Sequence, residues 1–113
     1  MKRYKTICID FDGTIHRYSR GWKGGELYDP PHEGAIEAIQ TLSQNGYNVI
    51  IFTTRGHSEE SIAEVRQWLK KYGMPSEKAD SIVITNIKQP ALAYIDDRAI
   101  RFTSWNDMSK YFV

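Results

Sequence analysis

The chain has 113 residues, of which 41% are hydrophobic and 26% charged, and these proportions exclude a disordered or fibrous protein and suit one globular domain over residues 1–113. Fifteen Lys and Arg residues against 14 Asp and Glu residues give a formal net charge of +1, so no global field favours nucleic acid or an anionic membrane. No apolar run approaches the roughly 20 residues that span a bilayer, and we therefore expect a soluble protein of the cytoplasm.

The first predicted element is a short strand over residues 6–9, whose residues are nearly all apolar, as in a strand buried on both faces. The only cysteine, Cys8, lies inside it, which excludes an internal disulfide and favours a small core side chain over a reactive thiol. Residues 15–32 follow without a helical period and contain glycines, aromatics and two adjacent prolines. A loop this long in a compact domain is usually functional.

A helix is predicted from Ala35, where apolar residues begin to recur at helical spacing, and residues 47–52 read as a second buried strand. A second helix follows, for which residues 61–64 fit a capping box and Gly73 supplies the end. Two more strands are predicted over 81–85 and 91–95, and a last helix after Ser104, with Trp105, Met108 and Phe112 on one face. Strands that alternate with helices predict an α/β fold with a three-layer, Rossmann-like parallel sheet flanked by helices.

Polar residues follow the ends of three of these strands. They are Asp10 and Asp12, then Thr53, Thr54 and Arg55, then Asp96 and Asp97. Ligands of an open parallel sheet bind outside the carboxyl ends of its strands, so these side chains are expected to share one edge. Crowded carboxylates repel one another unless a divalent cation neutralises them, and Mg²⁺ with oxygen ligands and a substrate phosphate suits this composition. The sequence therefore predicts a magnesium site that binds a phosphorylated substrate.

Asp10 and Asp12 lie two residues apart in extended chain and so point to the same side, which lets one act as nucleophile and the other as acid and base. Attack on a phosphoryl group also needs positive charge nearby. Lys88 and Arg55 are the candidates, although an arginine here can equally pair with the neighbouring carboxylates, and the Thr53 hydroxyl can hold a phosphate oxygen.

The run Asp10-Phe11-Asp12-Gly13-Thr14 resembles the first signature motif of the haloacid-dehalogenase-like superfamily. That resemblance implies that Asp10 becomes phosphorylated, that Asp12 is the acid and base, and that the backbone carbonyl of Asp12 joins the metal shell. Thr53 matches the second motif, with Thr54 a less favoured occupant, and Lys88 matches the third. The acidic pair matches the fourth, with Asp97 as metal ligand and Asp96 in support.

The resemblance covers essentially the whole chain, but neither interval that holds a cap domain in other members has room for one here. It implies a capless phosphatase whose open site is closed by the 15–32 loop or by a partner subunit of a homo-oligomer. Residues 95–98 and 53–55 also resemble the phosphatase domain of polynucleotide kinase/phosphatases, so a nucleotide or nucleic-acid end is the first substrate to consider.

Within the 15–32 loop, Arg17 and Arg20 alternate with aromatic residues, a composition that can stack on a base and hold phosphate, or simply form a solvated hairpin tip. Two rival functions stay open. The chain could be a phosphotransferase that uses an acceptor other than water, or a nonenzymatic module that binds a phosphorylated partner, although the intact Asp10 and Asp12 pair disfavours the module.

Overall fold

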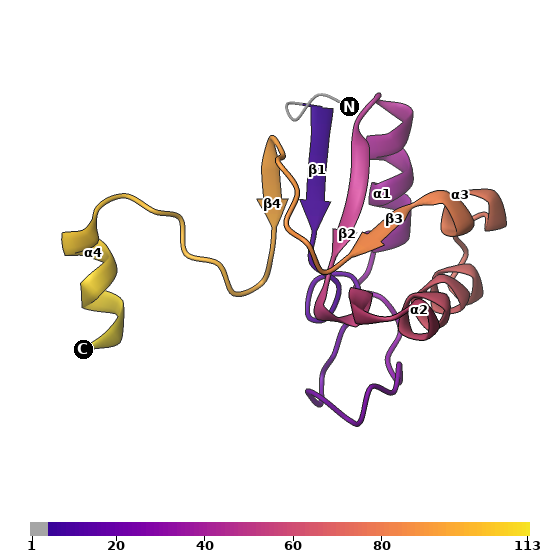
Figure 1. The fold of residues 1–113 in the computed structure, drawn as a ribbon, viewed down its shortest axis with the longest axis horizontal. Helices are drawn as coiled ribbons and strands as arrows, with labels where there is room; N and C mark the ends of the chain where they lie inside the picture. The colour runs from indigo at the N-terminus through magenta and orange to yellow at the C-terminus, as the bar shows by residue number, and fades with distance from the viewer. Residues whose placement is uncertain (1–4) are drawn as a thin grey trace.

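The computed structural model describes residues 5–113, so residues 1–4 of the expected 1–113 domain lie outside it. Its sheet has four parallel strands in the order β3-β2-β1-β4 (Figure 1). The strands are β1 (Thr6–Ile9), β2 (Asn48–Phe52), β3 (Val83–Thr85) and β4 (Ala93–Ile95). Flanked by helices, this sheet confirms the predicted α/β class with a Rossmann-like parallel arrangement.

The larger helices, α1 (Ala35–Gln44) and α2 (Glu59–Lys71), share one hydrophobic core with the inner strands. Ile39 of α1 and Leu69 of α2 pack in the same buried cluster as Ile51 of β2. Alternate residues of a strand face opposite sides of the sheet, so both helices cover the face to which Ile51 belongs. Cys8 points to the other face and is also buried, as expected of a small core side chain.

The start of α2 differs from the prediction. The helix begins at Glu59, and its N-cap is Ser58, whose Oγ accepts a hydrogen bond of 3.1 Å from the Ser61 N–H. The capping box expected at residues 61–64 is therefore wrong. Ser58 places Glu59 and Glu60 in the first turn, where the helix dipole favours carboxylates.

Residues 76–81 also depart from the sequence prediction, because they form the short helix α3 (Ser76–Ser81) directly before β3. The strand expected over 81–85 begins only at Val83. A six-residue helix leaves almost no periodic signal, and this one is held by burial of Ala79 and by Arg66, whose Nη1 donates to the Ala79 and Ile82 carbonyls at 2.8 and 2.7 Å.

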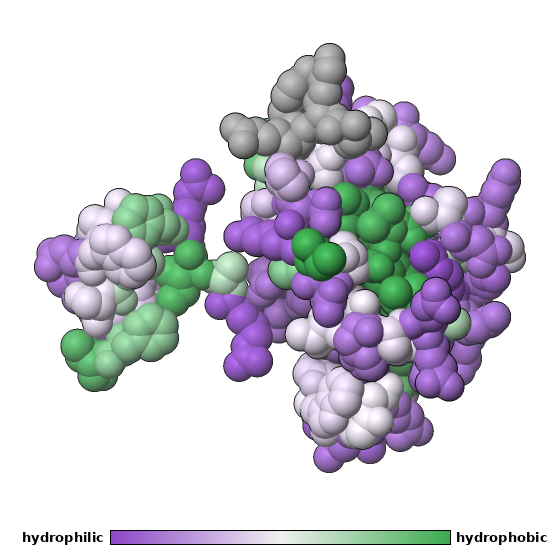
Figure 2. All heavy atoms as spheres, viewed as in Figure 1, coloured by the Kyte–Doolittle hydropathy of each residue, from purple (hydrophilic) through white to green (hydrophobic). Residues whose placement is uncertain are grey.

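Beyond β4 the chain leads away from the sheet to α4 (Trp105–Ser109) and a 3-10 turn, η3 (Lys110–Phe112) (Figure 1). The predicted helix is present, but the face expected to pack is exposed, with Trp105 79% and Phe112 81% accessible. Tyr94 and Ile95 of β4 are also exposed, because no helix of the described residues 5–113 covers this edge strand. Figure 2 shows apolar atoms over the strands and again on the C-terminal segment.

No helix among residues 5–113 has the length and apolar character needed to cross a membrane.

Candidate functional site

The carboxyl ends of β1 and β4 bring three acidic residues together. The Asp10 N–H donates to the Ile95 carbonyl at 2.9 Å, which extends the pairing of β1 with β4 by one residue. Asp10 therefore lies beside Asp96 and Asp97, and one carboxylate oxygen from each of the three lies within 4.8 Å of the others. This convergence of two strand ends is what strand polarity predicted from the sequence.

The negative charges of the three carboxylates repel one another. Burial raises the pKa of Asp10 to about 7, and the charge of Asp96 is the next largest cause, with Asp97 adding to it. Within residues 5–113, no Lys or Arg forms an ion pair with any of the three. Hard oxygen donors at this spacing, short of positive charge, fit a divalent cation such as Mg²⁺.

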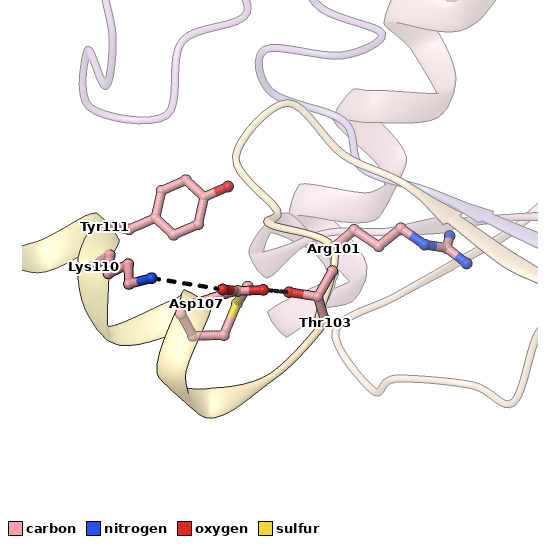
Figure 3. A pocket seen from close by; sticks show the side chains of 6 residues that line it. Arg101, Thr103, Asp107, Lys110 and Tyr111 are labelled. Carbon is pink, nitrogen blue, oxygen red and sulfur yellow. Dashed lines mark hydrogen bonds and ion pairs between the residues drawn. The ribbon is translucent and has the colours of Figure 1, made fainter.

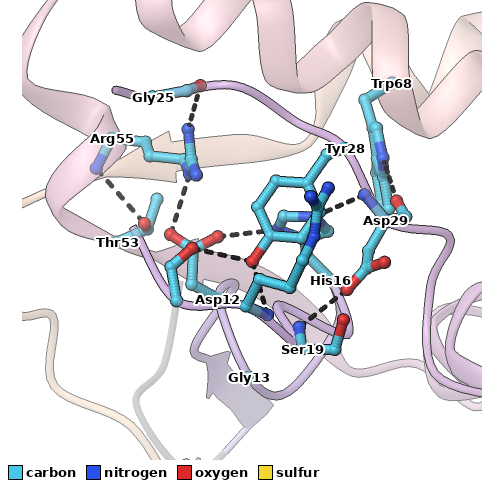
Figure 4. A network of polar contacts seen from close by, with 12 residues as sticks. Asp12, Gly13, His16, Ser19, Gly25, Tyr28, Asp29, Thr53, Arg55 and Trp68 are labelled. Atoms are coloured by element: carbon cyan, nitrogen blue, oxygen red, sulfur yellow. Dashed lines mark hydrogen bonds and ion pairs between the residues drawn. The ribbon is translucent and has the colours of Figure 1, made fainter. Parts of the chain in front are cut away.

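Asp12 has the opposite surroundings. Its Oδ2 accepts from the Arg55 Nε at 2.8 Å, and its Oδ1 lies 2.8 Å from the His16 Nδ1 (Figure 4). Both partners are buried. The Asp12 carboxylate is thus outside the cluster of Asp10, Asp96 and Asp97, and the expectation that its backbone carbonyl joins the metal shell stays a prediction.

A pocket of about 260 Å³ lies at this edge of the sheet. Its lining includes the predicted residues Asp10, Asp12, Thr53, Thr54 and Asp97, together with Tyr18, Trp22 and Arg98. Thr53 is held there by its N–H, which donates to the Thr85 carbonyl at 2.8 Å, and by its Oγ1, which accepts from the Arg55 N–H at 3.2 Å. Five predicted residues from three strand ends therefore face one cavity.

The turn that follows β1 can lie close to Asp97 because residue 13 is a glycine. Its φ of +89° lies in the left-handed region, and a Cβ there would collide with the Asp97 Oδ2. The Gly13 carbonyl accepts a 3.1 Å hydrogen bond from His32 Nε2. Glycine at this position thus lets the β1 turn approach the acidic pair closely.

Three other predicted residues do not line this pocket. The guanidinium of Arg55 is bound to Asp12 and, through Nη1, to the Gly25 carbonyl at 2.8 Å, so it serves the structural pairing that the sequence left open. The Lys88 Nζ lies 4.6 Å from the Tyr94 ring centroid, and Lys88 does not line the pocket. The Asp96 Oδ1 accepts from the Arg98 N–H at 2.7 Å.

Arg17 and Arg20 are also absent from the pocket lining. Residues 15–32 fold back on themselves, and the Arg20 guanidinium lies 4.4 Å from the Tyr28 ring centroid. The aromatic residues of this segment reach the pocket instead, since Tyr18 and Trp22 both line it. Tyr18 is also the one non-glycine residue with positive φ, at 57°, among residues 5–113.

Two functional candidates escaped the sequence analysis. Arg98 lines the pocket, and its position directly after the acidic pair was the available signal. His16 lies four residues after Asp12, a spacing that brings side chains together in helices. Because this turn is not helical, no sequence pattern predicted that the two side chains meet.

A second hollow, of about 440 Å³, lies within the C-terminal segment (Figure 3). Its one carboxylate, Asp107, accepts a 2.8 Å hydrogen bond from Thr103 and lies 4.0 Å from the Lys110 Nζ. A single compensated acid on one short segment offers no set of converging catalytic groups. The carboxyl edge of the sheet is therefore the candidate active site.

Comparison with known proteins gives a fold but no activity. No protein-family model matches the sequence, and no curated protein does. One solved structure, a conserved protein coded by a locus from Bacteroides thetaiotaomicron, is similar over 93% of this chain and 86% of its own, with 25% identity and a TM-score of 0.56.

Proposed function

We propose that the chain is a capless, Mg²⁺-dependent phosphomonoester hydrolase of the haloacid-dehalogenase-like type, with Asp10 as nucleophile. The observation that carries this proposal is the meeting of Asp10, Asp96 and Asp97 beside a pocket that Asp12 and Thr53 also line. An acidic cluster alone would bind a cation. A second carboxylate and a hydroxyl on the same pocket add the groups that phosphoryl transfer to a carboxylate requires.

The reaction follows from the placement of these two aspartates. An Asp10 oxygen attacks phosphorus while the ester P–O bond breaks, and the leaving oxygen takes a proton from Asp12, which gives an aspartyl-phosphate at Asp10. Water then attacks the phosphorus and gives a proton to Asp12. Phosphate leaves, and Asp10 is a free carboxylate again.

Mg²⁺ held by Asp10, Asp97 and Asp96 would supply positive charge to the phosphoryl oxygens and favour the ionised nucleophile. In this proposal the hydroxyl of Thr53, a residue that lines the pocket, holds a phosphate oxygen. In this proposal Lys88 also serves the phosphate, for which its ammonium has to leave the Tyr94 ring and turn toward the pocket. Arg98, already at the pocket, is the second cation of the site.

The walls of the pocket favour a substrate with a flat ring. Tyr18 and Trp22 line it together with the strand-end residues, and Trp22 is 60% exposed. The Arg55 guanidinium lies 5.1 Å from the Trp22 ring centroid, and the exposed part of the ring is available for stacking. Stacking on aromatic side chains tolerates any base, which suits a nucleotide or a nucleic-acid end. Residues 5–113 place no cap domain above the site, which leaves room for a large substrate.

Phosphate release from a panel of nucleotides, sugar phosphates and phosphorylated DNA ends tests the proposal. We expect release with Mg²⁺, none with chelator, and loss of activity in Asp10→Asn and Asp12→Asn. Asp80→Asn is the matched control, because Asp80 pairs with Lys70 on the surface far along the chain from both motifs. Release that neither active-site substitution alters would reject the mechanism.

The same panel separates the two rivals. A phosphotransferase would release little phosphate until an alcohol acceptor is added, since water is then a poor acceptor. A binding module would retain phosphorylated ligands without turnover, and Asp12→Asn would leave that binding intact.

A further inference from the structure

His16 completes a hydrogen-bond chain that runs from helix α2 to Asp12 (Figure 4). The Trp68 Nε1–H donates to the Asp29 carbonyl at 2.9 Å, and the Asp29 N–H donates to the His16 Nε2 at 3.1 Å. The His16 Nδ1 then lies 2.8 Å from the Asp12 Oδ1. Both nitrogens of the imidazole are therefore engaged.

The backbone N–H of Asp29 determines the tautomer of His16. A backbone N–H can only donate, so Nε2 must accept and carries no proton. The ring proton therefore lies on Nδ1, and that N–H donates to the Asp12 Oδ1. His16 acts in this arrangement as a neutral donor whose proton direction is fixed by a backbone group 13 residues along the chain.

The imidazole is also held rigidly. His16 is fully buried, at 0% exposure. Four aromatic rings surround it at centroid distances of 5.3 to 5.8 Å, and these belong to Phe11, Tyr18, Tyr28 and Trp68. A ring packed on this many sides cannot turn without displacing the core, so the Nδ1–H keeps one direction.

We infer that His16 is a positioning residue for Asp12, in that its Nδ1–H holds the Oδ1 and thereby keeps the other lone pairs of the carboxylate directed to the pocket. Arg55 holds the Oδ2 from the other side. A carboxylate fixed at both oxygens cannot rotate away from the leaving group, and orientation of an acid is worth a large part of its 10²–10⁴-fold effect, as an order of magnitude. The inference rests on the proposed function of Asp12 as acid and base.

Two substitutions separate this role from simple core packing. In His16→Asn the amide nitrogen takes the place of Nδ1 and can still donate to Asp12, whereas in His16→Gln the polar end takes the place of Nε2 and can accept only from Asp29. Both remove the ring and leave a similar hole. A merely structural histidine predicts equal loss in the two variants.

The readout is the ratio of kcat/KM for an alkyl phosphate to that for p-nitrophenyl phosphate. An alkoxide needs a proton from Asp12 as it leaves, whereas p-nitrophenolate leaves without one. We expect His16→Gln to lower this ratio by about 10- to 100-fold and His16→Asn to retain most of it. Equal effects of the two variants on both esters would overturn the inference.

The outcomes for His16 and for the proposed function are distinct. No phosphate release by the wild type, or release that survives Asp10→Asn, rejects the proposed function. Release that Asp10→Asn abolishes, with equal ratios in His16→Asn and His16→Gln, rejects only the positioning role.

A measurement on the intact ring covers the case in which both variants fail to fold. Of the three histidines, His32 and His57 can be replaced by Gln, which leaves His16 as the only imidazole for ¹⁵N NMR. We expect the nitrogen shifts of a neutral ring with its proton on Nδ1. A proton on Nε2, alone or in a charged ring, would overturn the inference because Asp29 could then not donate to it.

Discussion

Asp10 and Asp12 belong to one turn and line one pocket, yet their carboxylates have opposite surroundings. Asp12 accepts hydrogen bonds from a buried arginine and a buried histidine, whereas Asp10 faces the carboxylates of Asp96 and Asp97. The negative charge of Asp12 is compensated by protein side chains, whereas that of Asp10 has no positive partner among residues 5–113. The proposed roles, Asp10 as nucleophile and Asp12 as acid and base, therefore depend on a cation that would offset the repulsion around Asp10 and favour its ionised form.

The largest effect on activity is expected from removing the negative charge of Asp10, the proposed nucleophile. Asp10→Asn should lower kcat by at least about 10³-fold, because the amide cannot form the covalent intermediate. Asp12→Asn should lower kcat/KM for an alkyl phosphate by about 10²- to 10⁴-fold and should spare kcat/KM for substrates with good leaving groups, because kcat/KM reports the step that forms the aspartyl-phosphate. Steady-state rates with an alkyl and an aryl phosphate measure both. An Asp12→Asn loss that is the same for the two esters would contradict its assignment as acid.

Removing the partner of Asp12 should affect stability strongly. Arg55→Met leaves a partly buried carboxylate without its ion pair and the Gly25 carbonyl without a donor, so the free energy of unfolding should fall by about 3–5 kcal/mol. Urea denaturation measures this loss. The double variant with Asp12→Asn should recover part of it, and the exposed Arg101→Met should be silent. No recovery in the double variant would show that the pair is not what Arg55 contributes.

The acidic cluster should destabilise the protein when no metal is bound. The pKa of Asp10 is raised from 3.8 to about 7, so the folded state keeps this proton longer than the unfolded chain. Its contribution therefore becomes unfavourable as pH rises from 3.8 to about 7 and stays so above that range. In chelator at pH 8, Asp10→Asn should be more stable than wild type by about 1–2 kcal/mol, after allowance for the partial exposure of the group.

Thermal melts of the two proteins at pH 5 and pH 8, with chelator and with Mg²⁺, measure that effect. The advantage of Asp10→Asn should shrink at pH 5, and Mg²⁺ should raise the midpoint of the wild type more than that of the variant. A wild type that is equally stable relative to Asp10→Asn at both pH values would contradict the raised pKa.

The smallest effect is expected from Gly13→Ala, which tests the proposed metal site. Gly13→Ala should weaken Mg²⁺ binding by about tenfold, because the new Cβ displaces Asp97, and should cost about 1–2 kcal/mol of stability at a positive φ. Gly21→Ala is the matched control, since Gly21 also has positive φ, +68°, but a Cβ there meets nothing within 4 Å. Calorimetric titration should find Mg²⁺ affinity unchanged in Gly21→Ala.

Part of this site was accessible from the sequence because parallel strands place their carboxyl ends at one edge. Asp10 and Asp97 are 87 positions apart, yet Asp10 directly follows β1 and the pair Asp96-Asp97 directly follows β4, and that rule alone brought them together. Arg55 could not be resolved in the same way. Its position after a strand end was compatible with binding substrate or with pairing to a carboxylate, and only the packing of Gly25 and Asp12 around it selected the second.

The C-terminal part shows where local patterns stop being informative. The apolar spacing of Trp105 and Phe112 correctly indicated a helix but not whether anything packs on it, and both side chains are exposed. Lys88 fits a motif by order along the chain, yet its ammonium lies over the Tyr94 ring, a contact that no local pattern indicates.

By itself, the sequence determined the parallel α/β arrangement, the buried strands and the acidic residues at their ends, since these depend on apolar runs and chain polarity that are local properties. The tertiary structure alone decided which carboxylate receives compensating donors. Arg55 reaches Asp12 from 43 positions along the chain, and Asp29 bonds His16, which in turn contacts Asp12. Such tertiary pairing has no period or spacing for a sequence to display.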